Sequence, residues 1–426
     1  MEKKDYKINI VGDGLSGLTA ARVLESHGYR PKVYEALDCV GGRLKTDIIE
    51  GYQLDRGFQV LLSAYPKLKE YARMEDLDLQ QLKPGAVIFS EGKSQRIGDP
   101  FRDPSALLPT VFSSIGNLAD KWKIIKLNLE LRKKSPEEIF SGRETTTLQY
   151  LNEKGFSEKM INSFFRPFFG GIFLENELRT SSYMFEFIYK MFGEGRAVIP
   201  KSGIEALPAQ MAKGLVNTTF YFNTPVKQVS NEGLILSNNK RLASHFTIIA
   251  TEAEELIKNL RGQQVKWKSC YNFYFTTKQK KIEDAVIGLI ADEEALINNI
   301  FYPTSIATAS SGSQQLLSVT VIKETALPVE ELKQKIIDEL RKHCGIEVEK
   351  FLKYYHIKKA LPDLSQAHYE IDPTETKLST QIFLAGDQLL NASQNAAILS
   401  GERAALGVIQ TLESGAITSE ITSEYS

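Results

Sequence analysis

The first 35 residues constrain this chain more than any other stretch. An apolar run at residues 8–11 leads directly into the glycine-rich stretch Gly12–Gly17, and a second apolar run at residues 32–34 ends at Glu35. This spacing predicts a strand, a glycine turn, a helix and a second strand. It indicates a dinucleotide site, because the N–H groups at a helix N-terminus hold a pyrophosphate and the backbone can approach it only where side chains are missing.

Each glycine of the stretch has its own predicted role. Gly12 permits the tight turn, Gly14 leaves space for a phosphate, and Gly17 lets the helix lie close to the strand. Leu15 and Ser16, between the last two glycines, complete the predicted contacts to the dinucleotide. Since glycine clusters also build ordinary turns, the flanking strands and helix carry the prediction.

Two carboxylates accompany the glycine turn. Glu35 is predicted to lie at the tip of the second strand, where it can accept hydrogen bonds from both ribose hydroxyls of a dinucleotide. Asp13 stands between two of the glycines, and a carboxylate beside a phosphate is acceptable there only if it points to solvent. We therefore expect Asp13 to be exposed.

Length and charge restrict the remaining possibilities. At 426 residues the chain is expected to form two intimately joined domains. Its 52 basic and 53 acidic residues nearly cancel, so no global field attracts nucleic acid. The three cysteines show neither metal-ligand nor redox-pair spacing, which favours a reduced, cytoplasmic protein without a metal site.

No apolar run is long enough for a membrane-spanning helix, and residues 416–426 are expected to form a disordered tail.

A second glycine pair, Gly41 and Gly42, is followed directly by Arg43. Backbone N–H donors next to a guanidinium suit the other side of the same pyrophosphate. A surface turn with an unremarkable arginine is the alternative. The position downstream of the first motif favours the cofactor interpretation.

This combination resembles the superfamily of FAD-dependent amine oxidases and carotenoid desaturases, in which the double-glycine–arginine motif follows the dinucleotide fold and helps to fix FAD. The stretch Gly57–Pro66 is similar to the phytoene and zeta-carotene desaturase branch, which usually has a histidine where this chain has Gln59. The resemblance implies that Phe58 and Gln59 lie at the substrate pocket. A role that needs an imidazole does not carry over to Gln59.

A third motif lies near the C-terminus. An apolar run at residues 382–385 delivers Gly386 and Asp387 to a strand end, where the carboxylate can bind ribityl and phosphate groups. The small-residue helix that follows includes Ala396 and Ala397. Its N-terminus can face the pyrimidine edge of a flavin, where negative charge accumulates on reduction. For an isolated motif, a strand–turn–helix with a capping aspartate is the alternative.

The same segment separates the branches of the superfamily. Monoamine oxidases place a tyrosine of their aromatic cage at the position of Ser393 and often carry a flavin-linking cysteine slightly earlier, and this chain has neither. The resemblance therefore implies that FAD is bound non-covalently, with Ser393 at the substrate pocket. In the superfamily, the position that matches Val226 meets the adenine end through its backbone.

The middle of the chain, residues 67–193, is predicted to be mainly helical. Apolar residues recur there at three- and four-residue steps, which predicts an amphipathic helix or helix pair: Leu107, Leu108, Val111, Ile115, Leu118 and Trp122. Core packing is one explanation of this stripe. The other is a helix that lies on a membrane at the entrance of an apolar pocket, and Lys121, Lys123 and Lys126 would suit anionic lipid.

Aromatic residues mark two candidate walls of a substrate pocket. Five phenylalanines at residues 164–173, among them Phe168 and Phe169, surround a proline and a glycine pair. They could line a long apolar pocket or fill a junction between domains. Tyr271 and Phe273 alternate on one face of a predicted strand and could form the opposite wall.

These elements predict an α/β fold with a Rossmann-like FAD-binding domain and an interleaved α+β substrate domain. The FAD-binding domain is assigned to residues 1–70, 195–265 and 362–415, and the substrate-binding domain to residues 71–194 and 266–361. Many amine oxidases hold a water near the flavin with a lysine of the substrate domain. Neither Lys266 nor Lys268 can be matched to that lysine from the sequence.

The resulting hypothesis is an FAD-dependent oxidoreductase that removes hydride from, or rearranges double bonds in, an apolar isoprenoid- or polyene-like substrate. The alternatives are a protoporphyrinogen-oxidase-like or amine-oxidase-like flavoenzyme and, outside enzymes, a lipid-binding protein like the Rab GDP-dissociation inhibitors. No side-chain acid or base is assigned, because the five histidines are scattered through the chain. The expected partners are a small apolar molecule and a membrane surface at its entrance, but no nucleic acid, and the electron acceptor stays open.

Overall fold

The computed structural model describes residues 1–90, 92–98, 115–258, 260 and 264–414. Its first sheet has five parallel strands in the order β10-β2-β1-β14-β20. These strands span Thr219–Tyr221 (β10), Lys32–Tyr34 (β2), Ile8–Val11 (β1), Phe246–Ile249 (β14) and Ile382–Leu384 (β20). All residues of β1 and β14 are buried, as expected for the central strands of a parallel sheet covered on both faces. The strands predicted from the first 35 residues are confirmed.

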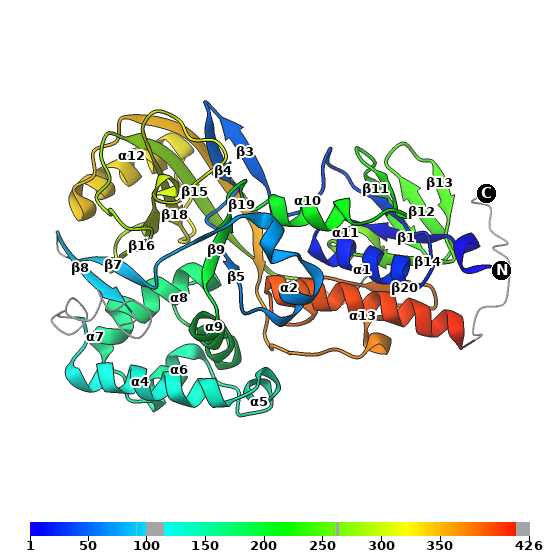
Figure 1. Cartoon of the computed structure of the whole chain (residues 1–426), viewed down its shortest axis with the longest axis horizontal. Coiled ribbons are helices and arrows are strands. Elements are labelled where there is room, and N and C mark those ends of the chain that lie inside the picture. The colour runs from blue at the N-terminus through cyan, green and yellow to red at the C-terminus, as the bar shows by residue number, and fades with distance from the viewer. Residues whose placement is uncertain (91, 99–114, 259, 261–263, 415–426) are drawn as a thin grey trace.

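Two long helices from opposite ends of the chain lie against this sheet. α1 (Leu15–Ser26) follows the glycine turn, and α13 (Gln394–Glu413) lies near the C-terminus. They run side by side in Figure 1, at the blue and red ends of the colour range. A Cβ atom on Gly401 of α13 would lie only 2.1 Å from the carbonyl oxygen of Ser16 in α1. The close approach therefore requires a glycine, and it brings both ends of the chain to one place.

Shorter elements complete this half of the molecule. A three-stranded antiparallel sheet consists of β11 (Val226–Ser230), β12 (Gly233–Leu236) and β13 (Arg241–Ala243). The remaining elements are the hairpin of β3 (Thr46–Ile49) and β4 (Tyr52–Asp55) and the helices α2 (Pro66–Tyr71), α10 (Ala206–Lys213) and α11 (Ala253–Leu256). The five parallel strands come from residues 8–34, 219–249 and 382–384, which fall in the three segments that the sequence assigns to the FAD-binding domain.

The second sheet has seven strands in the order β19-β15-β18-β17-β16-β7-β8 and is antiparallel except between β16 and β7. Its strands span Lys350–Pro362 (β19), Trp267–Thr277 (β15), Gln315–Val321 (β18), Ile297–Phe301 (β17), Ile287–Ile290 (β16), Gly85–Ser90 (β7) and Lys93–Gly98 (β8). The helix α12 (Val329–Glu339) packs on one face through Leu332 and Ile336. The predicted α+β character of this region is confirmed.

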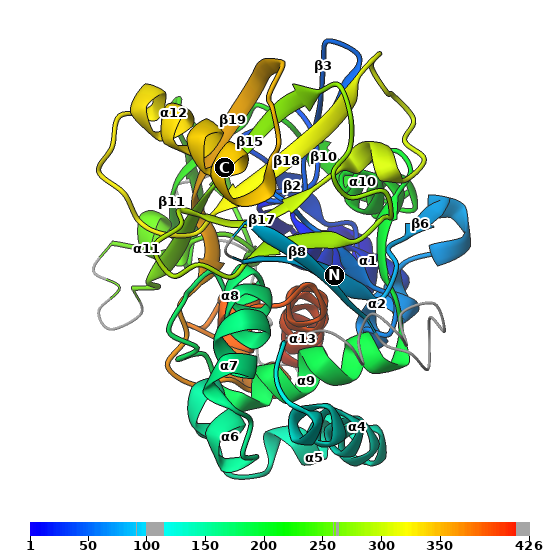
Figure 2. The same cartoon turned by 90° about the vertical axis from the view of Figure 1, so that its left-hand side faces the viewer.

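A group of helices lies below the seven-stranded sheet in Figures 1 and 2. They are α4 (Leu118–Lys133), α5 (Pro136–Phe140), α6 (Thr147–Glu153), α7 (Glu158–Met160), α8 (Arg166–Phe173) and α9 (Ser182–Glu194). The prediction that residues 67–193 are mainly helical needs a correction, because β7, β8 and the short strand β6 (Leu79–Gln81) lie within them. The β7 segment Gly85–Ser90 is rich in apolar and β-branched residues that pair in the sheet, and a helical period taken over the whole region missed it.

The apolar stripe predicted from residue 107 onward is only partly covered by the structure. Its first three members lie outside the described residues, namely Leu107, Leu108 and Val111. Ile115 is buried, whereas Leu118 and Trp122 are 69% and 72% exposed. Core packing therefore does not explain the end of the stripe that the structure describes.

Short elements join the two halves. The strands β5 (Leu61–Leu62), β9 (Ala197–Pro200) and β6 form a small sheet that lies between the large ones in Figure 1. Short 3₁₀ helices span Lys3–Asp5, Met74–Leu77, Pro303–Ser305, Pro373–Thr376 and Asp387–Leu389, and π-helical turns span Ile161–Phe165 and Leu340–Cys344. In the described part of the chain, no helix is both long and apolar enough to cross a membrane. The predicted tail at residues 416–426 lies outside the described residues.

Candidate functional site

A large cavity joins the glycine turn to the aromatic helices. Its volume is about 1430 Å³, and residues of all three sequence motifs line it together with α8 and α9. The predicted site residues that line it are Gly12, Gly14, Leu15, Ser16, Glu35, Gly41, Gly42, Arg43, Gly386, Asp387, Ser393, Ala397, Phe58, Gln59, Phe168 and Phe169. Segments from both ends of the chain therefore meet at one site.

The three glycines of the first motif are required for different reasons. Gly12 has a φ of 96°, and a Cβ there would lie 2.9 Å from the carbonyl oxygen of Ala250. A Cβ on Gly17 would lie 2.0 Å from the carbonyl oxygen of Gly12, which agrees with its predicted role in packing. At Gly14, the nearest described atom would be the Cα of Gly42 at 4.0 Å. Packing within the chain therefore explains two of the glycines, and the third leaves open space in the cavity for a ligand.

Glu35 is held in place by backbone donors before any ligand binds. Its Oε2 accepts a hydrogen bond from the N–H of Asp13 at 3.1 Å, and its Oε1 accepts one from the N–H of Leu37 at 2.9 Å. The side chain is 9% exposed and lies on the cavity wall. Its carboxylate is therefore oriented for the hydrogen bonds to ribose hydroxyls that the sequence predicts.

Asp13 corrects a prediction, because its side chain is fully buried instead of pointing to solvent. One oxygen, Oδ1, accepts a hydrogen bond from the N–H of Gly41 at 3.2 Å, and Oδ2 has no hydrogen-bond partner. Burial, and after it the negative charge of Glu35, raise the pKa of Asp13 to about 8. The carboxyl is therefore protonated at neutral pH, and a neutral acid can be tolerated where a carboxylate could not.

Lys45, which was not among the predicted site residues, stabilises the backbone just before the Gly41–Arg43 loop. Lys45 is 4% exposed, and its Nζ donates to the carbonyl oxygens of Cys39 and Val40 at 2.8 Å and 2.6 Å. Gly42 has a φ of 58° and a Cβ there would lie 3.2 Å from the Cα of Gly14, so the two glycine motifs lie against each other. A lysine two residues after an arginine carries no sequence signal that would distinguish it from a surface residue.

Arg43 and Asp387 connect the second motif with the third. Nη2 of Arg43 lies 2.5 Å from Oδ1 of Asp387, whose side chain is only 5% exposed. The guanidinium also lies over the ring of Trp267, 5.5 Å from its centroid. The indole Nε1 of Trp267 is buried without a hydrogen-bond partner and Trp267 lines the cavity, so it is a polar atom that a ligand could satisfy.

Three site residues were predicted at the start of α13, and two of them, Ser393 and Ala397, line the cavity. Ser393 caps the helix, because its Oγ accepts a hydrogen bond from the N–H of Ala396 at 3.0 Å. Ala397 and Gln394 line the cavity, and Oε1 of Gln394 is buried without a partner. Ala396 does not line it: its side chain packs in a small apolar cluster and its N–H is taken by the cap, which corrects the prediction.

Val226 lies behind the cavity wall. It begins β11, and its side chain packs against an apolar cluster that includes Val11 and Ile249. The N–H of Thr224, two residues earlier, donates to the carbonyl oxygen of Glu35 at 2.8 Å. Val226 is thus near the predicted ribose ligand without lining the cavity, and the backbone contact implied by the resemblance stays a prediction.

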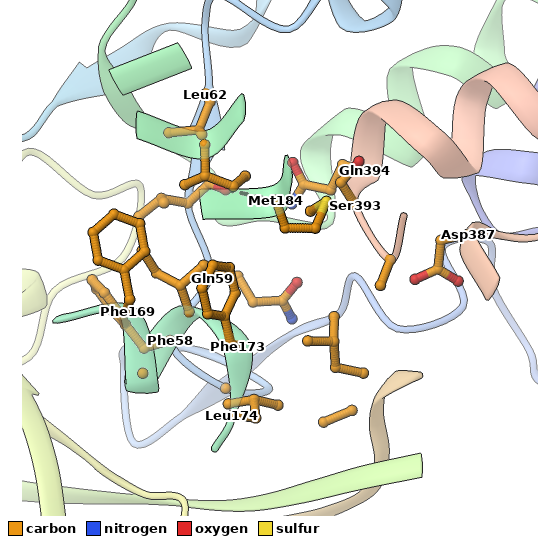
Figure 3. A pocket seen from close by; sticks show the side chains of 18 of the residues that line it. Phe58, Gln59, Leu62, Phe169, Phe173, Leu174, Met184, Asp387, Ser393 and Gln394 are labelled. Carbon is orange, nitrogen blue, oxygen red and sulfur yellow. Dashed lines mark hydrogen bonds between the residues drawn. The ribbon is translucent and has the colours of Figure 1, made fainter. Parts of the chain in front are cut away.

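The far end of the cavity is apolar and aromatic. Figure 3 shows Phe58, Phe169 and Phe173 on one side, with Asp387, Ser393 and Gln394 across from them. Other apolar residues of α8 and α9 that line the cavity are Phe168, Ile172, Met184, Ile188, Tyr189 and Phe192. Nε2 of Gln59 donates to the backbone carbonyls of Arg43 and Arg56, both at 3.1 Å. Gln59 therefore holds the loop between cofactor and substrate ends in place.

Tyr271 and Phe273 correct the second predicted wall. Both belong to the apolar cluster on the α12 side of the seven-stranded sheet, where Phe273 is fully buried, and neither lines the cavity. The sequence correctly predicted that Tyr271 and Phe273 lie on one face of β15. A period of two shows which residues share a face of a strand, but not which face lies toward the cavity. The helix α12 covers the aromatic face, so the face toward the cavity is the other one.

That other face contributes polar side chains to the cavity, and of these the sequence singled out only Lys268, without a role. Asn299 and Thr320 line the cavity, and Nδ2 of Asn299 donates to Oγ1 of Thr320 at 3.3 Å. Lys268 lines it as well, with Nζ 3.2 Å from Oδ1 of Asp363. Asparagine inside the apolar segment Ile297–Phe301 was the available signal, since a buried strand seldom carries an amide without a reason.

Comparison with known proteins places this geometry in context. A family model for flavin containing amine oxidoreductases matches residues 15–409. Protoporphyrinogen oxidase 2 of Arabidopsis thaliana is 27% identical over 165 residues, which cover 39% of this chain and 32% of the relative. An L-amino-acid oxidase of Bothrops moojeni is 31% identical over 159 residues, which cover 35% and 32%. The chain thus matches about a third of the length of these relatives.

A solved structure shows the same fold over almost the whole chain. A putative protoporphyrinogen oxidase from Exiguobacterium sp. 255-15 superimposes with a TM-score of 0.72 at 17% sequence identity, and the match covers 95% of this chain and 99% of the other. The predicted α/β class, with a Rossmann-like parallel sheet and a mixed sheet in the second half of the molecule, is confirmed. The specific resemblance to the desaturase branch stays a prediction.

Proposed function

Because the chain belongs to the family of flavin-containing amine oxidoreductases, we propose that it binds FAD non-covalently and removes hydride from a bulky, apolar substrate. The observation that carries this proposal is the cavity of about 1430 Å³, which begins at the glycine turn and ends among phenylalanines. A pocket for one drug-sized ligand usually measures about 300–1,000 Å³. The cavity therefore has room for a substrate next to a dinucleotide.

The residues at the glycine end fit the ADP half of FAD. Open space in front of Gly14 would admit the pyrophosphate, and the helix N-terminus at Leu15 and Ser16 offers N–H donors to it. Glu35 would accept the ribose hydroxyls, and Arg43 would approach the pyrophosphate from the opposite side. When bound, FAD would supply a two-electron acceptor for a hydride.

The residues near α13 fit the flavin end. The N-terminus of α13 lies at the cavity and its dipole would favour negative charge on a reduced ring system. Asp387 would reach ribityl hydroxyls while it holds Arg43 in place. Residues 385–400 contain no cysteine, which supports non-covalent binding. The aromatic helices would exclude water from the reacting carbon and orient it.

The substrate class follows from the size and the lining of the far end. A cyclic tetrapyrrole of the protoporphyrinogen type is the first candidate, because two of the relatives above carry that name. The basic side chains Lys121 and Arg196 also line the cavity and would suit carboxylates on an otherwise apolar ring. The asparagine and threonine of the sheet wall add hydrogen-bonding groups that a pure hydrocarbon would leave unused.

A polyene or other isoprenoid is the second candidate. The row of phenylalanines at α8 favours it, since an extended hydrocarbon would be buried along the whole aromatic wall. A small amine is disfavoured, because the large cavity would leave it loosely held and Ser393 stands where an aromatic cage would need a ring. The L-amino-acid oxidase likeness is the support for an amine.

The test begins with the purified protein and its visible spectrum. We expect a bound flavin that heat or acid releases into solution, as non-covalent binding requires. Under anaerobic conditions we expect a porphyrinogen to bleach the flavin band, a polyene to bleach it if the second candidate holds, and putrescine or L-leucine to leave it unchanged.

Two results would overturn the proposal. A colourless protein that takes up no added FAD would remove the cofactor assignment. Bleaching by an amine alone would remove the bulky apolar substrate and leave an amine oxidase.

A further inference from the structure

An exposed apolar ridge runs along α4. The α4 ridge consists of Leu118, Trp122, Ile125 and Leu129, whose spacing of four, three and four residues places them on one helix face. Leu118, Trp122 and Leu129 are 69%, 72% and 56% exposed. The opposite face of α4 is buried through Leu127 and Leu131. The helix is therefore apolar on two faces, and only one of them is explained by packing.

Basic residues flank the α4 ridge on both sides. At about 100° per residue, Lys126 and Lys133 fall on one side of it, and Lys121 and Arg132 fall on the other. The two acidic residues of the helix are turned away from the ridge: Asp120 is fully buried, and Glu130 lies 2.7 Å from Nζ of Lys154. The chain as a whole has a net charge of -1, so this concentration of positive charge is local.

The α4 ridge lies next to the cavity. Lys121, Ile124, Ile125 and Asn128 of α4 all line it, so Ile125 belongs to both the ridge and the cavity wall. In Figures 1 and 2, α4 lies in the lower part of the molecule, among the helices below the seven-stranded sheet. The α4 ridge and the cavity wall therefore adjoin each other at Ile125.

We propose that the α4 ridge docks on an anionic lipid surface and that the substrate enters the cavity from there; the second half of this statement rests on the proposed function. An apolar face bordered by lysine and arginine is the pattern of a helix that lies in a membrane interface, with its apolar side chains among the acyl chains and its cations at the headgroups. A second copy of this chain fits the ridge less well, because two such faces would bring their lysines together.

The first experiment measures binding to vesicles. The flavin-loaded protein is mixed with vesicles of phosphatidylcholine alone or of phosphatidylcholine with phosphatidylserine, and the bound fraction is found by sedimentation. We expect binding to the anionic vesicles that weakens with salt. Since each basic residue near a membrane contributes about fivefold to affinity, Lys126→Gln together with Lys133→Gln should weaken binding roughly 25-fold. Trp122→Ser together with Leu129→Ser should abolish it.

Matched controls lie elsewhere on the surface. Lys335→Gln with Lys342→Gln repeats the seven-residue spacing of the lysine pair: Lys335 lies in α12 and Lys342 in the π-helical turn that follows it, and both residues are exposed. Val216→Ser removes an apolar side chain that is 83% exposed. Both controls should bind anionic vesicles as the unchanged protein does.

Fluorescence gives a second measurement. The chain has two tryptophans, and the other one, Trp267, lies at the cavity beside Arg43. We expect the emission to shift to shorter wavelength when anionic vesicles are added. Trp122→Phe should keep the binding and remove the shift.

Three results would overturn the proposal. The first is no binding to anionic vesicles at low salt. The second is binding that the ridge variants weaken no more than the controls do. The third is that the wild-type protein is a dimer and that Trp122→Ser makes it a monomer without changing vesicle binding. That result would assign the α4 ridge to a contact between two copies of the chain. Flavin content and bleaching by a detergent-solubilised substrate are measured on the same preparations, so failure of the proposed function would be seen separately.

Discussion

At the scale of single residues, Asp13 and Glu35 form a pair of buried carboxyl groups beside the glycine turn. Burial, followed by the charge of Glu35, raises the pKa of Asp13 to about 8 from the ordinary value of 3.8. The folded protein therefore holds a proton that the unfolded chain loses above about pH 4.

We expect Asp13→Asn to flatten a pH dependence of stability. Because the folded pKa lies above the unfolded one, the contribution of the Asp13 proton is fully present below about pH 4 and is lost as the pH rises to about 8. One proton contributes a slope of at most about 1.4 kcal/mol per pH unit. Urea unfolding of the flavin-free protein between about pH 5 and pH 8 measures the slope. Equal slopes in wild type and variant would contradict the assignment.

The ion pair between Arg43 and Asp387 leads to a second expectation. Asp387→Asn should weaken FAD binding roughly 10- to 150-fold, since a hydrogen bond between charged groups contributes about 1.5–3 kcal/mol and Arg43 would lose its orientation. Titration of FAD into the flavin-free protein measures the dissociation constant. Glu370→Gln, which breaks the exposed pair with Arg403, is the control and should leave it unchanged. An unaltered affinity in Asp387→Asn would remove Asp387 from the binding site.

At the scale of elements, the turn between β1 and α1 contains one glycine that the ligand site requires, Gly14, and another that packing within the chain requires, Gly17. We expect Gly14→Ala to leave the unfolding free energy within about 0.5 kcal/mol of wild type and to weaken FAD binding at least tenfold. Gly17→Ala should instead destabilise the protein by about 1–3 kcal/mol, because its Cβ would lie 2.0 Å from the carbonyl oxygen of Gly12. Unfolding and FAD titration on both variants test the difference. Loss of stability in Gly14→Ala would show that the chain itself fills that space.

The helices α8 and α9 carry the substrate wall. Phe168 is half-buried, stacks on Phe164 with ring centroids 5.4 Å apart, and lines the cavity. We expect Phe168→Ala to raise the KM for the bulky donor that bleaches the flavin about 10- to 150-fold, from the loss of about 1.5–3 kcal/mol of apolar contact, with the flavin content unchanged. Phe351→Ala removes a ring on the α12 side of the sheet and should leave KM as it is. If Phe168→Ala also lowered the flavin content of the purified protein, Phe168 would belong to the cofactor site instead.

At the scale of the whole molecule, the site exists because the two ends of the chain meet. The helices α1 and α13 approach each other closely at Gly401, where a Cβ would lie 2.1 Å from the carbonyl oxygen of Ser16. Both helices also contribute to the cavity wall. The fold of the terminal segments and the shape of the cofactor site are therefore coupled.

We expect Gly401→Ala to reduce both stability and FAD affinity. The added methyl group should cost about 1–3 kcal/mol, because the α1 backbone must move away. Gly193→Ala in α9 is the control, since a Cβ there would meet no described atom within 4 Å. Thermal unfolding with and without FAD measures both effects. A variant that loses stability but keeps its affinity would show that the crossing and the cofactor site are independent.

Prediction from sequence worked best where a local requirement is encoded in neighbouring residues. The turn at Gly12–Gly17, the strand that ends at Glu35 and the position of Asp387 at a strand end depend on backbone geometry within a few residues, and the structure contains all of them. The aromatic wall at α8 was also found, since Phe168 and Phe169 line the cavity. Lys45, Asn299 and Thr320 were missed because their roles depend on partners far along the chain.

By itself, the sequence determined the dinucleotide motif, the α/β class and the three segments that meet at the cavity, because glycine spacing and apolar runs act over short distances. Only the tertiary structure decided which face each element turns inward. Asp13 is buried because Gly41 and Glu35 close over it, Tyr271 and Phe273 turn away from the cavity because α12 covers them, and Trp122 is exposed because nothing in the described chain packs on it. Such choices depend on what lies opposite each face, and periodicity contains no information about that partner.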